Sequence, residues 1–97
     1  MEELKISWLV DVEVFDRLQF KDYLHGLNEL VKEFSGEFVK EFSLPEIVEG
    51  DWRPRTLLLI FEFEDKAYFN RFKNSSQLRN LRYQFNDVAS FKSVIMR

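Results

Sequence analysis

Residues 4–14 alternate between apolar and polar side chains, and this regularity restricts what the chain can fold into. One face of this segment would carry Leu4, Ile6, Trp8, Val10, Val12 and Val14. A period of two predicts a β-strand with one face in a core. Asp16 then supplies an N-cap acceptor, and Gln19 completes a capping-box pattern. Apolar residues next recur every three or four positions, which predicts a helix. We expect Gly36 to end this helix in the left-handed conformation.

The rest of the chain continues the order of strands and helices. The patterns predict a strand over 37–42, a loop over 43–54, an apolar strand over 55–63, a helix from Asp65 to about Phe72, a break at 74–76, a further helical stretch to about Phe85 and a last strand over 88–96. The order βαββαβ is that of the ferredoxin-like fold. We therefore predict one α+β domain over residues 1–97, with a four-stranded antiparallel sheet and two helices on one face.

The apolar strand also predicts a partner. Its residues are apolar on both faces, with Leu57, Leu59, Phe61 and Phe63 on one and Leu58 and Ile60 on the other. The helices cover one sheet face, so the second apolar face needs another cover. A second copy related by a two-fold axis is the simplest one. We therefore expect a homodimer in the form of a dimeric α/β barrel.

Composition excludes several classes of function. The chain has no cysteine and one histidine, so thiolate metal sites and a histidine cluster within one chain are excluded. No phosphate-binding glycine loop or nucleophile elbow occurs, and we expect no cofactor and no metal. No secretory leader or membrane-spanning run is visible, which favours a cytoplasmic location. The segment 55–63 lacks the glycine and stacking rings of RNA-recognition strands, so no nucleic-acid partner is expected.

Charge is distributed unevenly along the chain. Residues 1–65 contain seven Lys and Arg against sixteen Asp and Glu, whereas residues 66–97 contain seven Lys and Arg against Asp87 alone. Such asymmetry can mark a face that binds anions or nucleic acid. The alternative interpretation is that the two halves neutralise each other within the fold or across a dimer. Arg79 and Arg82, three positions apart on one helix, could bind an anion, although a solvated helix face is the commoner arrangement.

The segment 48–63, VEGDWRPRTLLLIFEF, resembles a bacterial family catalogued as domain of unknown function thirteen-thirty. The matching residues, in order, are Gly50, Asp51, Trp52, Pro54, Arg55, Glu62, Phe63, Asn74 and Ser75. The chain departs from the family pattern near the second helix. It has Phe72-Lys73 where Trp-Tyr is usual, Ser76 in place of a proline and Leu78 in place of a tyrosine. The resemblance implies a ferredoxin-like fold assembled as a dimeric α/β barrel, and it implies no established activity.

Few residues are candidates for a site. Trp52, Arg53 and Arg55 could bind a carboxylate or phosphate because arginine offers a forked donor. The alternative is a structural role, in which Asp51 pairs with an arginine and Trp52 packs against the partner subunit. Trp8 is a candidate cavity-wall or core residue, and Tyr23 could join a polar pocket near His25. His25, the sole imidazole, is a candidate general base, although a lone helical histidine is more often a surface residue.

These features support one function and leave an alternative open. The first hypothesis is that a small organic molecule, including an organic anion, binds in a barrel cavity. Cofactor-independent oxygenase or isomerase chemistry would then act on it, by fold-level analogy. The alternative is a structural or regulatory dimerisation domain without catalysis. The sequence does not decide whether the protein is an enzyme.

Overall fold

The computed structural model describes residues 5–43, 46–51 and 57–97. Its four strands are β1 (Ile6–Val14), β2 (Gly36–Ser43), β3 (Leu57–Phe63) and β4 (Ala89–Met96). Its three helices are α1 (Arg17–Glu33), α2 (Lys66–Lys73) and α3 (Ser76–Gln84). The predicted element order is therefore confirmed, with the second helical segment divided into α2 and α3 at the expected break.

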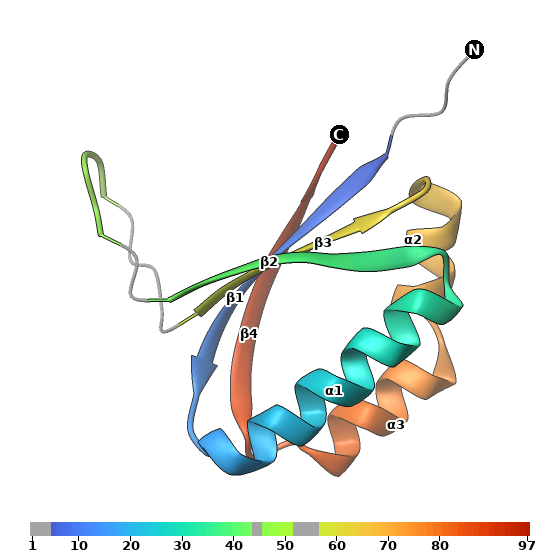
Figure 1. Cartoon of the computed structure of the whole chain (residues 1–97), viewed down its shortest axis with the longest axis horizontal. Coiled ribbons are helices and arrows are strands. Elements are labelled where there is room, and N and C mark those ends of the chain that lie inside the picture. The colour runs from blue at the N-terminus through green and yellow to red at the C-terminus, as the bar shows by residue number, and fades with distance from the viewer. Residues whose placement is uncertain (1–4, 44–45, 52–56) are drawn as a thin grey trace.

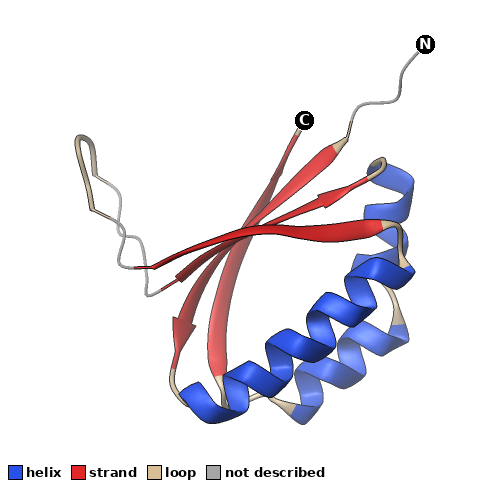
Figure 2. Ribbon diagram, in the orientation of Figure 1, coloured by secondary structure: helices blue, strands red, loops and turns tan. Residues whose placement is uncertain are grey.

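The four strands form one antiparallel sheet in the order β2-β3-β1-β4 (Figure 1). All three helices lie on the same side of this sheet, so its other face is open (Figure 2). This arrangement confirms the predicted α+β, ferredoxin-like class. The sequence predicted two helices on that face, and the structure has three because the α2–α3 turn separates the second helical segment. None of the described helices is long and apolar enough to cross a membrane.

The start of α1 forms as the sequence predicts. Asp16 adopts an extended conformation, and its Oδ1 accepts a hydrogen bond of 3.0 Å from the backbone N–H of Gln19. The Gln19 side chain returns a 3.1 Å bond to Asp16 Oδ2. These bonds satisfy groups at the helix start that would otherwise lack a partner.

The end of α1 differs from the prediction. Ser35, with a φ of 59°, takes the left-handed conformation, and Gly36 is already the first residue of β2. The structure requires glycine there for close packing. A Cβ on Gly36 would lie 2.7 Å from Val31 Cγ1 and 2.8 Å from Phe63 Cδ1. The assignment of Gly36 as the left-handed residue was therefore wrong, although glycine is needed at this junction.

The core lies between the sheet and the helices. Alternation in β1 and β3 places Trp8 opposite Phe61 and Val10 opposite Leu59 on the helix-facing side, where all four are buried. Two aromatic clusters fill the space under the helices. The first contains Trp8, Phe34, Phe61, Phe63, Phe69 and Phe72, and the second contains Phe20, Tyr23, Phe85 and Phe91. The high phenylalanine content is thus mostly core.

The opposite sheet face is open and apolar at its centre. Ile60, Leu9 and Val94 lie side by side across β3, β1 and β4 in one row of the register. Leu58 and Met96 belong to the same face, and Met96 is 49% exposed. In the following text, the open face means this side of the sheet.

Candidate functional site

A cavity of about 480 Å³ lies between α2, α3 and the edge strand β4. Its lining consists of Trp8, Lys66, Phe69, Asn70, Phe72, Lys73, Leu78, Arg82, Ser93, Val94 and Ile95. We call it the α2–β4 cavity. Its volume falls within the range of small-molecule sites in proteins, about 300–1,000 Å³. The cavity exists because α2 and α3 meet at a turn and leave the end of β4 partly uncovered.

Three aromatic rings form an apolar surface in this cavity. The centroid of Trp8 lies 5.2 Å from that of Phe72 and 5.8 Å from that of Phe69. Trp8 also packs 5.2 Å from Phe61, which fixes the indole against β3. The Phe69 and Phe72 rings are inclined to the indole of Trp8 by 59° and 68°, and all three rings are at most 5% exposed. They therefore form a packed apolar floor of the cavity.

The polar part of the lining is cationic. Lys66, Lys73 and Arg82 contribute three positive charges, and no carboxylate lines the cavity among the described residues. Lys66 and Lys73 are seven positions apart, so they share one side of α2 and their Cα atoms are separated by about 10 Å along the helix. Asn70 and Ser93 add neutral hydrogen-bonding groups. The cavity therefore combines an apolar aromatic floor with positive charge, which suits a small organic anion.

Arg82 connects this cavity to a buried hydroxyl. Its guanidinium lies over the Phe91 ring at 5.4 Å, and Tyr23 packs on the same ring at 5.3 Å. The Tyr23 hydroxyl is buried and has no hydrogen-bond partner of standard geometry. Burial raises the pKa of Tyr23 above its ordinary value, while the charge and proximity of Arg82 oppose that rise. Tyr23 therefore stays protonated at neutral pH.

The structure separates the residues that the sequence suggested together. Trp8 lines the α2–β4 cavity, Tyr23 is 1% exposed in the adjoining core, and His25 is exposed on the outer side of α1, away from this cavity. Trp52, Arg53 and Arg55 lie outside the described residues.

Sequence reasoning missed Lys66 and Lys73 as site residues. The available signal was the basic composition of the last third of the chain, which the structure gathers partly around one cavity. Three positions at which the chain departs from the family pattern, Phe72, Lys73 and Leu78, also line this cavity. Three of the four departures therefore lie at this cavity, and the fourth, Ser76, does not line it.

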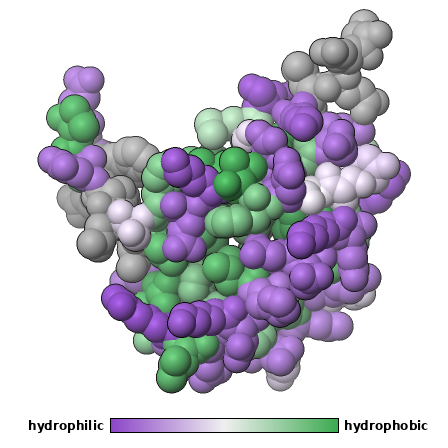
Figure 3. Space-filling view, in the orientation of Figure 1, coloured by the Kyte–Doolittle hydropathy of each residue, from purple (hydrophilic) through white to green (hydrophobic). Residues whose placement is uncertain are grey.

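Two other hollows differ in chemistry. A groove of about 500 Å³ between α1 and β2 is lined by Val14, Arg17, Phe20, Lys21, Leu24, Glu41, Ser43 and Leu57, and apolar surface is visible between these two elements (Figure 3). This α1–β2 groove carries charges of both signs. It is lined by Ser43 and Leu57, which flank the loop that holds the candidate arginines.

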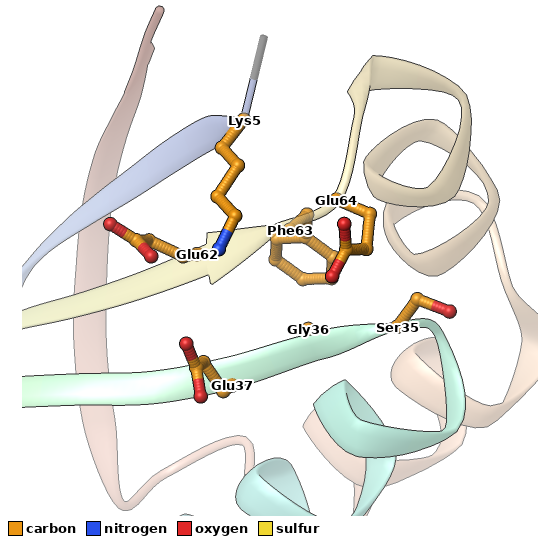
Figure 4. A pocket seen from close by; sticks show the side chains of 7 residues that line it. All are labelled: Lys5, Ser35, Gly36, Glu37, Glu62, Phe63 and Glu64. Carbon is orange, nitrogen blue, oxygen red and sulfur yellow. The ribbon is translucent and has the colours of Figure 1, made fainter. Parts of the chain in front are cut away.

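The third hollow is acidic. Glu37, Glu62 and Glu64 surround it with Lys5 at one end of the sheet, and its volume is about 300 Å³ (Figure 4). Glu37 and Glu62 lie directly opposite each other across β2 and β3. No group of metal-ligating side chains occurs within the part of the chain that the structure describes. This hollow is a negatively charged end of the sheet.

Comparison with solved structures places the chain in a class by its fold. SnoaB, a cofactor-independent oxygenase from Streptomyces nogalater, aligns with a TM-score of 0.71 and 12% identity, over 96% of this chain and 91% of that protein. A protein of unknown function from Rhodopseudomonas palustris aligns with a TM-score of 0.70 and 12% identity, over 96% and 82%. A possible oxidoreductase from Bacteroides thetaiotaomicron aligns with a TM-score of 0.59 and 14% identity, over 95% of each chain. At such identities, these similarities show the shared ferredoxin-like fold.

The family follows from the sequence itself. Residues 5–97 match the family model described as Domain of unknown function (DUF1330), and the chain belongs to that family. The resemblance inferred from the loop and strand residues is thereby confirmed. No curated protein matches the chain.

Proposed function

We propose that this protein binds a small, planar organic anion in the α2–β4 cavity. The observation that carries the proposal is the combination of a fixed aromatic surface, formed by Trp8, Phe69 and Phe72, with three cations and no lining carboxylate among the described residues. The aromatic floor supplies apolar contact, and the cations favour a carboxylate or phenolate over its neutral form. Few precisely placed polar groups in an apolar cavity are typical of small-molecule sites.

Charge reversal at the cavity tests this proposal. The probe is 2-naphthoate, a flat carboxylate, titrated into the protein by isothermal calorimetry. We expect Lys66→Glu/Lys73→Glu to weaken binding by about tenfold or more, because two attractive charges become repulsive. The exposed side chains make these substitutions compatible with folding.

A matched control separates a local effect from a change in overall charge. Arg17→Glu/Lys21→Glu alters the net charge equally but lies at the α1–β2 groove. We expect it to change naphthoate affinity by less than about twofold. Equal losses in both double variants, or no saturable binding to the wild type at millimolar probe, would contradict the proposal.

Oxygenase chemistry without a cofactor is the reaction we propose for such a site. Cations that favour a carboxylate also stabilise an enolate or phenolate. Dioxygen would react with this electron-rich anion at a ring C–H, so that this C–H and the C–OH become the two C=O groups of a quinone while the second oxygen atom of dioxygen leaves as water. The electrons come from the substrate, so the step balances. The resemblance of the fold to SnoaB supports this choice. Dioxygen consumption with hydroxynaphthoates, lost in Lys66→Glu/Lys73→Glu, is the measurement that checks it.

A homodimer through the open face is the partner we propose. Leu9, Ile60 and Val94 form an apolar row there, and Val94 is 56% exposed. Val94 also lines the α2–β4 cavity, so the proposed interface reaches the edge of the site. If the protein binds no ligand, a non-catalytic dimerisation domain is the function that this face supports. The contribution of Trp52, Arg53 and Arg55 to anion binding, catalysis by His25 and a cytoplasmic location stay predictions from the sequence.

A further inference from the structure

The Tyr23 hydroxyl is a buried donor without an acceptor. Tyr23 is 1% exposed, and its ring is fixed by Phe20, Phe85 and Phe91 at centroid distances of 6.0, 5.9 and 5.3 Å. These neighbours are hydrocarbon and accept no conventional hydrogen bond. Arg82 beside the hydroxyl can donate to its oxygen but cannot accept its proton. A buried donor without an acceptor destabilises a protein, so such a donor in a fixed position points to a role in the bound state.

Arg82 is the charged residue beside this hydroxyl. It stacks on Phe91, the ring on which Tyr23 also packs, and its side chain lines the α2–β4 cavity. A guanidinium has five donors and no acceptor, so it cannot take the hydroxyl proton. Tyr23 and Arg82 therefore present donors at one place, and the buried Tyr23 hydroxyl lacks an acceptor for its proton.

We propose that Tyr23 and Arg82 together form an oxyanion subsite at one end of the α2–β4 cavity. This inference rests on the proposed function and specifies it. A carboxylate or phenolate oxygen would accept one hydrogen bond from the guanidinium and a second from the tyrosine hydroxyl. Arg82 lines the cavity and lies beside the hydroxyl, whereas Tyr23 itself is buried behind the lining. The subsite therefore requires the exposed Arg82 side chain, which has several rotatable bonds, to change rotamer as the oxygen atom binds.

The subsite defines the ligand more narrowly than the cavity does. The acidic group lies at the Arg82 end, and the attached ring system extends over Trp8 toward α2. Burial raises the pKa of Tyr23. The hydroxyl therefore stays protonated across the neutral range and can donate a hydrogen bond. The favoured ligand is an aromatic carboxylate or phenolate. A neutral amide analogue of the carboxylate lacks the charge that the subsite recognises.

Two probes of equal shape test the subsite. The uncharged 2-naphthamide has nearly the outline of 2-naphthoate, and calorimetry gives the dissociation constant of each. We expect Tyr23→Phe to weaken naphthoate binding by about fivefold and Arg82→Gln by about tenfold or more, with naphthamide affinity changed less than about twofold in both. This charge-selective loss is the result that a cavity change alone would not produce.

Stability of the free protein provides a second readout. If the hydroxyl has no partner without ligand, Tyr23→Phe keeps or raises the urea midpoint while it weakens naphthoate binding. A lowered midpoint together with unchanged affinity would overturn the subsite.

The proposed function can fail separately. Should Tyr23→Phe and Arg82→Gln bind naphthoate like the wild type while Lys66→Glu/Lys73→Glu does not, the subsite is wrong and the cavity proposal stands. Absence of naphthoate binding to the wild type overturns both.

Discussion

At the scale of single residues, helix geometry separates Tyr23 from His25, which were predicted to share a polar pocket because they are close in the sequence. Tyr23 and His25 are two positions apart, and such residues on a helix point about 200° from each other. Tyr23 therefore faces the core while His25 is exposed. The periodicity that predicted this helix is confirmed by α1, but a polar pocket that joins the Tyr23 and His25 side chains does not form within it.

The burial of Tyr23 has a consequence for stability at alkaline pH. The pKa of this hydroxyl is raised in the folded state above the ordinary value of 10.0, chiefly by burial. Below pH 10 both states are protonated. As the pH rises above 10, the unfolded chain loses this proton first, so the wild type loses stability until the folded pKa is reached. Arg82, the charged group beside it, moderates this loss.

We expect the free energy of unfolding of Tyr23→Phe minus that of the wild type to be constant up to about pH 9 and to increase above pH 10. Urea titrations at several pH values measure it. Contributions that are common to both proteins cancel in the difference. A difference that stays flat to pH 11.5 would show that Tyr23 ionises alike in the folded and unfolded states.

At the scale of elements, the turn between α2 and α3 builds the site. Ser75 Oγ accepts a 3.1 Å bond from the Leu78 N–H and donates a 2.7 Å bond to the Phe72 carbonyl oxygen, so one side chain joins both helices. Arg79 Nη1 donates to the Asn74 carbonyl oxygen at 3.3 Å. Because Phe72 and Leu78 line the cavity, the angle between the helices determines its shape.

We predict that Ser75→Ala lowers the free energy of unfolding by about 1 kcal/mol through loss of the N-cap acceptor of α3. It should also weaken naphthoate binding, because the two helices lose one of their links. Ser75→Thr is the matched control, since threonine keeps the hydroxyl. Urea denaturation and calorimetry measure the two effects. An alanine variant as stable as the wild type would show that the Ser75 side chain does not fix this turn.

The sequence predicts those features that depend on residues close together in the chain, and it does not predict those that depend on contacts between distant residues. Alternation in residues 6–14, the caps at Asp16 and Asp65 and the break at Asn74-Ser75 are local, and the structure confirms them. The role of Gly36 depends on Val31 and Phe63, which approach it only in the fold. The α2–β4 cavity likewise requires Lys66 and Trp8 to meet from distant parts of the sequence. No local pattern carries that information.

At the scale of the whole molecule, the open face determines how copies of the chain associate. The helices leave the row of Leu9, Ile60 and Val94 uncovered, and the acidic hollow with Glu37, Glu62 and Glu64 lies at one end of this face (Figure 4). In a two-fold contact every substituted residue enters the interface twice. A charge placed in the apolar row is therefore strongly unfavourable to pairing.

We expect the wild type to be a dimer in native mass spectrometry and analytical ultracentrifugation. Ile60→Glu should raise the dimer dissociation constant by about a hundredfold or more, because two desolvated charges would enter one interface. Leu18→Glu is the control, since Leu18 is 79% exposed on the outer side of α1. A monomeric wild type, or an Ile60→Glu protein that pairs as tightly as Leu18→Glu, would rule out the open face as the interface.

The measurement that tests the central claim most directly is the indole N–H signal of Trp8 in a proton–nitrogen NMR spectrum during titration with 2-naphthoate. The chain has two tryptophans, so a Trp52→Phe variant assigns the signal. A planar anion bound in the α2–β4 cavity should shift the Trp8 signal saturably, and the Lys66→Glu/Lys73→Glu variant should lose most of that shift at the same probe concentration. A Trp8 signal that stays fixed while naphthoate binds would place the ligand elsewhere and contradict the proposed site.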